Sequence, residues 1–314
     1  MDETPAGVAV IPPAGLLRIA VRVTAMAMLL LACVPLYYAC RLVDVRNPWP
    51  RRFLSGIARI AGVTIKITGE RPGSGEFLLA NHVSWIDVPA LAAASGSAFV
   101  AHDGLGTQPL LRWLCAMNDT VLVARHDRAS VHRQVEQVRA AIRDTGALTI
   151  FPEGTTSDGT GLLQFKSSLL SALEPLPAGI AVRPVVLDYG AEAPTIAWIG
   201  TEHGLDNFKR IVGRSKPIQL NVRFLPVLSD EALTNRKTIA AAAQAAILQA
   251  LRAACGKSAT VTESNLARPG GVATGSPSDS VASLARVPDP HCTTLLAEKL
   301  PVTISVVQIY RTPL

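Results

Sequence analysis

A histidine and an aspartate lie five residues apart in the segment Asn81-His82-Val83-Ser84-Trp85-Ile86-Asp87. An imidazole is well suited to accept a proton near neutral pH. A carboxylate on its other ring nitrogen would fix the tautomer and stabilise the imidazolium that forms. Residues five apart do not share a helix face, so the two can meet only if His82 lies in a turn ahead of a helix that carries Asp87. This spacing indicates a general base with an orienting carboxylate.

A second polar segment, Phe151-Pro152-Glu153-Gly154-Thr155-Thr156-Ser157, follows an apolar run. Gly154 permits a tight turn, and the neighbouring amides and hydroxyls can bind an anionic oxygen. An ordinary strand-to-loop turn would have the same composition. Between the two segments, Arg125 follows the apolar residues 121–124. A guanidinium there can hold a phosphate or carboxylate, or can simply be solvated at the surface.

The elements that must position these residues are predicted from the hydrophobic pattern. Residues 63–68 alternate at period two and predict a strand, and further strands are predicted at 77–80, 98–101, 121–124, 147–151, 180–187, 195–199 and 218–224. Helical patterns cover residues 129–145 and 237–255, the second ending before Gly256. Strands that alternate with helices predict an α/β domain with a mixed, largely parallel sheet flanked by helices.

The N-terminal segment is strongly apolar. Residues 23–40 form a charge-free run of 18 residues, close to the ~20 that a helix needs to cross a bilayer. Pro35 lies inside the run and would kink or end a helix. Three interpretations stay open: a single membrane span, an interfacial helix pair divided at Pro35, and a cleaved signal with its processing site at 30–33. The heavier arginine content after the run favours a catalytic domain on the cytoplasmic face of the inner or plasma membrane.

Composition excludes several other classes. The chain of 314 residues is 49% hydrophobic and 17% charged, with a mean hydropathy of +0.30 and a formal net charge of +6. A basic excess suits nucleic acid or anionic lipid. With only 5% aromatic residues and no clustered basic stripe, nucleic-acid binding is not expected. The five cysteines are scattered without a C-x-x-C pair, so no metal or cofactor is expected.

Three parts follow from these patterns. Residues 1–50 form a membrane-associated segment, residues 51–257 the catalytic domain, and residues 258–314 a tail. The tail between 258 and 290 is rich in Ser, Thr, Gly, Pro and Ala without periodicity, which is typical of disorder.

Four ordered blocks resemble those of the glycerolipid acyltransferases: Asn81-His82-x-Ser84-x-x-Asp87, Arg125, Phe151-Pro152-Glu153-Gly154-Thr155 and Val182-Arg183-Pro184-Val185. The resemblance runs from about residue 63 to 224. It implies transfer of a fatty acyl group from an acyl-carrier-protein or coenzyme A thioester to the hydroxyl of a membrane lysolipid. It also implies His82 as general base and Asp87 as its orienting residue. The residues implied to bind substrate are Asn81, Ser84, Arg125, Glu153, Gly154 and Thr155.

Two departures from the family pattern leave the acceptor open. Thr156 stands where many phosphate-acceptor members have Arg, and residues 99–102 lack the Lys that many carry before the second block. Both departures remove positive charge that would favour a phosphate. The favoured acceptor is 1-acylglycerol-3-phosphate, giving phosphatidic acid in phospholipid synthesis, and the alternative is lyso-ornithine lipid.

Two other classes compete less well. A serine esterase would need a G-x-S-x-G elbow, and the sequence has none. A non-catalytic membrane module that retains the fold is disfavoured by the intact His82, Asp87 and Glu153.

Overall fold

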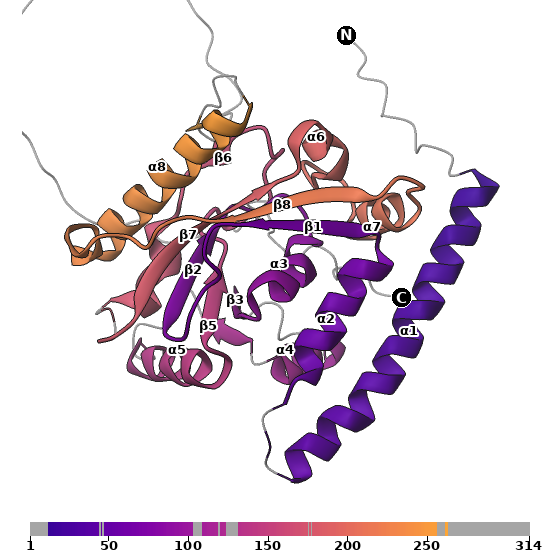
Figure 1. The fold of residues 1–314 in the computed structure, drawn as a ribbon, viewed down its shortest axis with the longest axis horizontal. Helices are drawn as coiled ribbons and strands as arrows, with labels where there is room; N and C mark the ends of the chain where they lie inside the picture. The colour runs from indigo at the N-terminus through magenta and orange to yellow at the C-terminus, as the bar shows by residue number, and fades with distance from the viewer. Residues whose placement is uncertain are drawn as a thin grey trace, which may run out of the picture. The chain divides into compact units, whose positions relative to one another are not determined.

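The computed structural model describes residues 12–43, 45, 47–102, 109–118, 120–123, 131–174, 176, 178–255 and 261–262. Its centre is a seven-stranded sheet in the order β1-β8-β7-β2-β5-β3-β4 (Figure 1). Neighbouring strands are parallel except β7 and β8. The strands are β1 (Val63–Thr68), β2 (Glu76–Ala80), β3 (Ala98–His102), β4 (Val121–Val123), β5 (Ala147–Ile150), β7 (Ala181–Asp188) and β8 (Ile218–Phe224). The predicted mixed, largely parallel sheet is confirmed.

Helices cover both faces of this sheet. They are α3 (Asp87–Ser95), α4 (Pro109–Met117), α5 (Val131–Thr145), α6 (Ala193–Ile196), α7 (Gly204–Val212) and α8 (Arg236–Cys255). Three 3₁₀ helices, η3 (Ser167–Leu173), η4 (Gly190–Glu192) and η5 (Asp230–Thr234), lie in the connections. Two short strands, β6 (Leu162–Leu163) and β9 (Val261–Thr262), pair with each other in parallel.

Two hydrophobic cores lie on opposite faces of β2. Phe77 and Leu79 pack in one core with residues of α5 and α8. Leu78 and Ala80 pack in the other with residues of α3, α6 and α7. Successive side chains of a strand point to opposite faces, so a strand covered on both faces is expected to be mostly apolar. All five residues of β2 and all four of β5 are buried.

The N-terminal helix α1 (Pro13–Leu42) runs for 30 residues without a break at Pro35. The helix pair divided at Pro35 is therefore wrong. An 18-residue window of α1 has a mean hydropathy of 2.2 and is only 6% buried, so by length and composition α1 can cross a membrane. Leu17, Met28 and Leu31 are more than half exposed, which leaves this apolar surface uncovered by the described protein.

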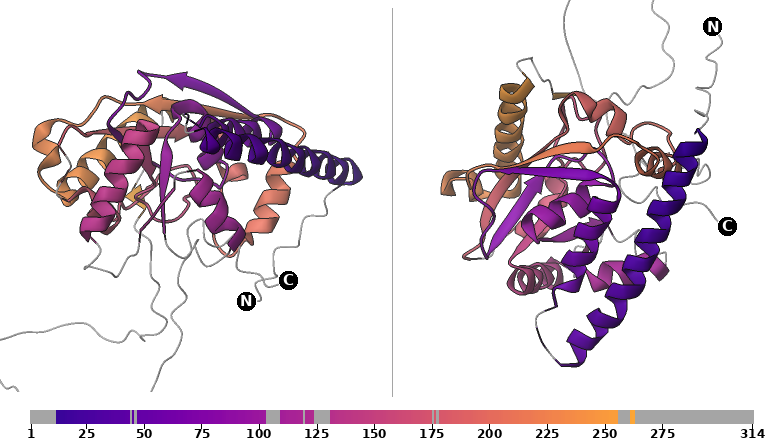
Figure 2. Two further views of the ribbon diagram at one scale, coloured as in Figure 1. Left: turned by 90° about the horizontal axis from the view of Figure 1, so that it is seen from below. Right: turned by 45° about the vertical axis from the view of Figure 1, so that its right-hand side comes forward.

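A second N-terminal helix, α2 (Trp49–Ile60), was not predicted. It packs between α1 and α3, and Figure 2 shows it running alongside α1. A Cβ atom at Gly56 would lie 2.4 Å from Leu29 Cδ2, so at this close approach of the two helices a larger residue would require the Leu29 side chain to move.

Two other sequence predictions differ from the structure. Residues 195–199, predicted as a strand, contain the end of α6 and a coil. Pro194 lies in the first turn of α6, where its fixed φ favours a helix. Within the predicted tail, Val261 and Thr262 form β9. The other residues of that range lie outside the described part of the chain, and the three-part division stays a prediction.

Candidate active site

The turn between β2 and α3 brings His82 and Asp87 together. His82 follows the end of β2, and Asp87 is the first residue of α3. His82 Nδ1 lies 2.7 Å from Asp87 Oδ2, and the side chains are 1% and 0% exposed. This is the turn-then-helix arrangement that their spacing predicts.

Donors converge on the carboxylate of Asp87. Besides His82 Nδ1, Oδ2 accepts hydrogen bonds from the amides of Val83 at 2.6 Å and Ser84 at 2.9 Å. Oδ1 accepts one from the Tyr189 hydroxyl. Hydrogen bonds to the charged form and a place in the first turn of a helix both stabilise an anion. Asp87 is therefore fixed as an acceptor for the imidazole.

The His82 ring is held in one orientation. It stacks on Phe151, with ring centroids 4.1 Å apart and an interplanar angle of 17°. With Asp87 ionised, the proton on the ring is assigned to Nδ1, which leaves a lone pair on Nε2. Nε2 is buried and has no hydrogen-bond partner among the described residues. A buried polar atom without a partner calls for a functional explanation, and accepting a substrate proton is one.

Glu153 is fully buried next to the main chain of His82, with an exposed fraction of 0%. Its Oε1 accepts a hydrogen bond from the His82 amide at 2.7 Å, and Oε2 accepts one from the Leu163 amide at 2.8 Å. Burial raises the pKa of Glu153 to about 8, against the lowering effect of these amides. The Glu153 side chain therefore connects the β2–α3 turn to the loop after β5. Acceptor binding by Glu153 stays a prediction.

The second polar segment also clamps the main chain around His82. The Ser157 amide donates to the His82 carbonyl at 2.7 Å, and the Ser157 hydroxyl donates to it at 3.1 Å. The Thr156 hydroxyl donates to the Trp198 carbonyl, and the Trp198 amide donates to the Val83 carbonyl at 2.9 Å. The structure thus brings the two predicted segments into one unit.

The side chains of Asn81 and Ser84 form hydrogen bonds with other parts of the protein. Asn81 Nδ2 donates to the Leu187 carbonyl at 2.9 Å, and the Leu187 amide donates to Asn81 Oδ1 at 2.7 Å. The Ser84 hydroxyl donates to Asn207 Oδ1 at 3.2 Å. Both side chains are buried, so they brace the end of β2 against β7 and α7. Their predicted role in substrate binding stays a prediction.

Gly154 adopts a φ of 69°, which favours glycine. A Cβ atom there would lie 3.0 Å from Leu169 Cδ1 and 3.2 Å from Lys166 Cδ. The Gly154 amide donates to the Phe151 carbonyl at 3.1 Å, so this amide is engaged in the turn. Thr155 is half-buried. Acceptor binding by Gly154 and Thr155 stays a prediction.

The two arginines of the predicted blocks differ in how far the structure describes them. Arg125 lies outside the described residues. Arg183 lies near the beginning of β7 and forms an ion pair with Glu76, with Nε 2.6 Å from Oε2 and Nη2 2.9 Å from Oε1. Because β2 and β7 are parallel, this pair lies toward the end of the sheet away from His82.

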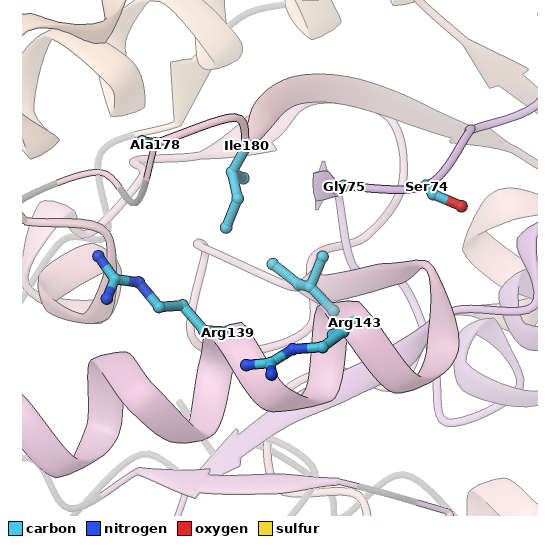
Figure 3. Close-up of a pocket in the computed structure, with 7 residues that line it drawn as sticks. Ser74, Gly75, Arg139, Arg143, Ala178 and Ile180 are labelled. Carbon is cyan, nitrogen blue, oxygen red and sulfur yellow. The ribbon is translucent and has the colours of Figure 1, made fainter.

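A separate cavity of about 360 Å³ lies at that far end of the sheet (Figure 3). Its lining residues precede β2 and β7 or lie on α5: Ser74, Gly75, Arg139, Ile142, Arg143, Ala178 and Ile180. None of the predicted site residues that the structure describes lines this cavity, and β2 separates Gly75 from His82. Among the described residues, no group of three or more His, Cys, Asp or Glu side chains could hold a metal ion.

Sequence reasoning missed Tyr189, the residue directly after β7. Its hydroxyl reaches Asp87, and the residue is 4% exposed. Burial, together with the neighbouring Asp87 carboxylate, raises the pKa of Tyr189 well above its ordinary value. Side chains that follow neighbouring parallel strands meet at one edge of a sheet, but that β7 pairs with β2 is known only from the structure.

Comparisons with known proteins identify the family. A sequence model of the acyltransferase family matches residues 63–188. A lyso-ornithine lipid O-acyltransferase from Brucella abortus is 30% identical over 245 residues, which cover 72% of this chain and 91% of that protein. A protein of the same name from Pseudomonas aeruginosa is 31% identical over 218 residues, covering 67% and 81%.

Phosphate-acceptor proteins are similar over a shorter stretch. A 1-acyl-sn-glycerol-3-phosphate acyltransferase from Neisseria gonorrhoeae is 32% identical over 142 residues, covering 43% of this chain and 53% of that protein. The crystal structure of the 1-acyl-sn-glycerophosphate acyltransferase PlsC from Thermotoga maritima superposes with a TM-score of 0.52 at 16% identity. It covers 76% of this chain and 97% of that chain, and it shows that the fold is shared.

Proposed function

Because this chain belongs to the glycerolipid acyltransferase family and is a membrane-associated O-acyltransferase of lysolipids, we propose that its acceptor is lyso-ornithine lipid. The observation that carries the proposal is the extent of similarity. Proteins named for that acceptor align over 67–75% of this chain and 81–91% of their own length. The phosphate-acceptor relative from Neisseria gonorrhoeae aligns over 43% and 53%.

The contacts of Thr156 support the same acceptor. Its hydroxyl donates to the Trp198 carbonyl, so at this position an uncharged side chain binds the protein main chain. Many phosphate-acceptor members have Arg at the matching position, where a guanidinium would attract phosphate. A head group without phosphate does not need that cation.

The proposed reaction is direct acyl transfer between two bound substrates. His82 Nε2 takes the proton of the lysolipid hydroxyl while that oxygen forms a bond to the thioester carbonyl carbon. The carbon–sulfur bond then breaks, and the departing thiolate takes the proton from the imidazolium. Asp87 holds the ring and stabilises its transient charge. The nucleophile is the acceptor itself, so no acyl-enzyme forms.

The acyl donor and the membrane side are also proposals. An acyl-carrier-protein or coenzyme A thioester supplies the acyl group, and no cofactor or metal ion takes part. Arg41, Arg51 and Arg52 follow the apolar run of residues 23–40, as does Arg46, while Arg18 and Arg22 precede it. By the positive-inside rule, the larger number of arginines after the run favours the cytoplasmic face for the catalytic domain.

A second candidate acceptor is 1-acylglycerol-3-phosphate. Two proteins named for this acceptor are 32% and 33% identical to this chain over 142 and 138 residues, which favours 1-acylglycerol-3-phosphate. Acylation would then yield phosphatidic acid.

A direct assay separates the two acceptors. Membranes that carry the protein are incubated with labelled acyl-carrier-protein thioester and, separately, with lyso-ornithine lipid or lysophosphatidic acid. Membranes that carry the His82→Ala variant give the background of the host. We expect labelled product above background with lyso-ornithine lipid. Product above background only with lysophosphatidic acid would overturn the proposed acceptor and place the enzyme in phospholipid synthesis.

A further inference from the structure

We infer that Tyr189 is a positioning residue of the catalytic pair, acting on His82 through Asp87; this inference rests on the proposed role of His82 as general base. The Tyr189 hydroxyl donates a hydrogen bond to Asp87 Oδ1, while Asp87 Oδ2 lies 2.7 Å from His82 Nδ1. The two carboxylate oxygens thus connect the phenol to the imidazole.

The position of Tyr189 makes this connection rigid. Tyr189 directly follows β7, the parallel neighbour of β2, and its ring belongs to the hydrophobic core around α3. Tyr189 and Asp87 are 4% and 0% exposed. Water therefore has little access to replace the phenol as a donor, and a buried carboxylate oxygen without a donor is costly.

The hydrogen bond also limits the basicity of the pair. The phenol donates to Asp87 and partly neutralises its charge, so the carboxylate is a weaker hydrogen-bond acceptor for the Nδ1 proton of His82. Removing the hydroxyl concentrates charge on Asp87. The imidazolium then becomes more stable, and His82 loses its free base form at a higher pH.

Glu153, from the loop after β5, is a further titratable residue described next to the pair, and its side chain accepts a hydrogen bond from the His82 amide. Burial raises the pKa of Glu153 and of Tyr189, and the charge of Asp87 adds to both shifts. Among the described residues, the Tyr189 hydroxyl contacts Asp87, whereas the Glu153 side chain contacts the His82 and Leu163 amides. Removing the Tyr189 hydroxyl therefore acts on the pair through Asp87.

The test is Tyr189→Phe, which keeps the ring and removes only the hydroxyl. We expect kcat to fall about ten-fold, as for loss of a hydrogen bond to a charged group, with KM for the lysolipid unchanged. The acidic limb of the pH–rate profile should move to higher pH. Tyr37→Phe makes the same chemical change on α1 and should leave kcat and the profile unchanged. A wild-type profile in Tyr189→Phe would overturn the inference.

Two further measurements separate this inference from the proposed function. The NMR titration of the His82 imidazole, assigned with His82→Ala, should move to higher pH in Tyr189→Phe whichever acceptor the enzyme uses. In the Asp87→Asn background, Tyr189→Phe should cost little further activity, because residues that act as a unit are not additive. An additive loss of activity in the double variant, together with an unmoved His82 titration in Tyr189→Phe, would show that Tyr189 has only a structural role. Failure of the lyso-ornithine lipid assay alone would overturn only the proposed acceptor.

Discussion

The His82 amide donates a hydrogen bond to Glu153 Oε1 at 2.7 Å, so the glutamate of the second polar segment holds the main chain of the proposed general base. Its other oxygen is engaged by the Leu163 amide at 2.8 Å. Glu153 thereby sets the distance between two loops that follow neighbouring strands, β2 and β5. Positioning the base is a different task from binding the acceptor, and kinetics distinguish the two.

Replacing Glu153 by Gln should lower kcat and leave KM for the lysolipid nearly unchanged. The amide keeps one acceptor oxygen but presents an N–H₂ group to a second main-chain donor, so His82 shifts from its position. We expect a fall in kcat of about ten- to a hundred-fold, the size of effect that a small misplacement of a catalytic group produces.

The control for this variant is Glu174→Gln, which changes an exposed glutamate on the surface. It should retain wild-type kinetics. A raised KM with unchanged kcat in Glu153→Gln would show instead that Glu153 binds the acceptor.

The buried Glu153 should also make stability depend on pH. Burial raises its pKa from an ordinary value of 4.5 to about 8, so between these values the folded carboxyl is protonated while the unfolded one is ionised. The unfolded state then binds fewer protons, and the free energy of unfolding falls as pH rises through this window. The contribution is on the order of a few kcal/mol.

Thermal melts of the wild type and of Glu153→Gln, compared at about pH 5 and about pH 8, measure this contribution. Because other carboxylates are common to both proteins, the difference between their melting temperatures isolates Glu153. The wild type should lose more stability than the variant at the higher pH. Parallel melting curves at all pH values would mean that Glu153 is already ionised at low pH in the folded protein.

The His82–Asp87 contact was predictable from sequence because both residues lie in one short segment, and helix geometry restricts how a spacing of five can close. The buried strands were predictable for a similar reason: β2 consists of apolar residues after Glu76, and β5 is apolar except for Thr149. The contacts of Glu153 and Tyr189 were not. Each depends on which strands are neighbours in the sheet, and β2 lies between β5 and β7 only because of the chain crossovers.

Sequence reasoning predicted no helix at residues 49–60. Helix α2 contains Pro50 and Gly56, which lower helix propensity, yet its packing against α1 and α3 stabilises it. The helix that carries Asp87 was inferred only from the spacing of His82 and Asp87, because α3 is buried along most of its length and so lacks the polar face from which an amphipathic helix is recognised.

Replacing His82 by Ala should abolish acyl transfer and leave membrane association intact. The His82 imidazole has a buried nitrogen without a partner among the described residues, and its removal takes away the proposed proton acceptor, whereas α1 is untouched. Flotation of the variant with liposomes checks membrane association, and thioester consumption checks turnover. Turnover near the wild-type rate in His82→Ala would contradict the proposed mechanism.

Arg183 should matter for folding rather than for turnover. Its guanidinium and the Glu76 carboxylate form a buried pair with side-chain exposures of 8% and 10%, at the end of the sheet away from His82. Arg183→Met leaves the Glu76 carboxylate buried without its cation, which costs about 3–5 kcal/mol for a buried pair. The melting temperature should therefore fall, while kcat per folded molecule stays close to that of the wild type.

The double variant Arg183→Met/Glu76→Gln completes this test. Removing both charges eliminates the unpaired carboxylate, so the double variant should recover part of the stability that Arg183→Met loses. A loss of kcat in Arg183→Met that persists in the folded double variant would assign Arg183 a role in the reaction, in conflict with its place near the beginning of β7.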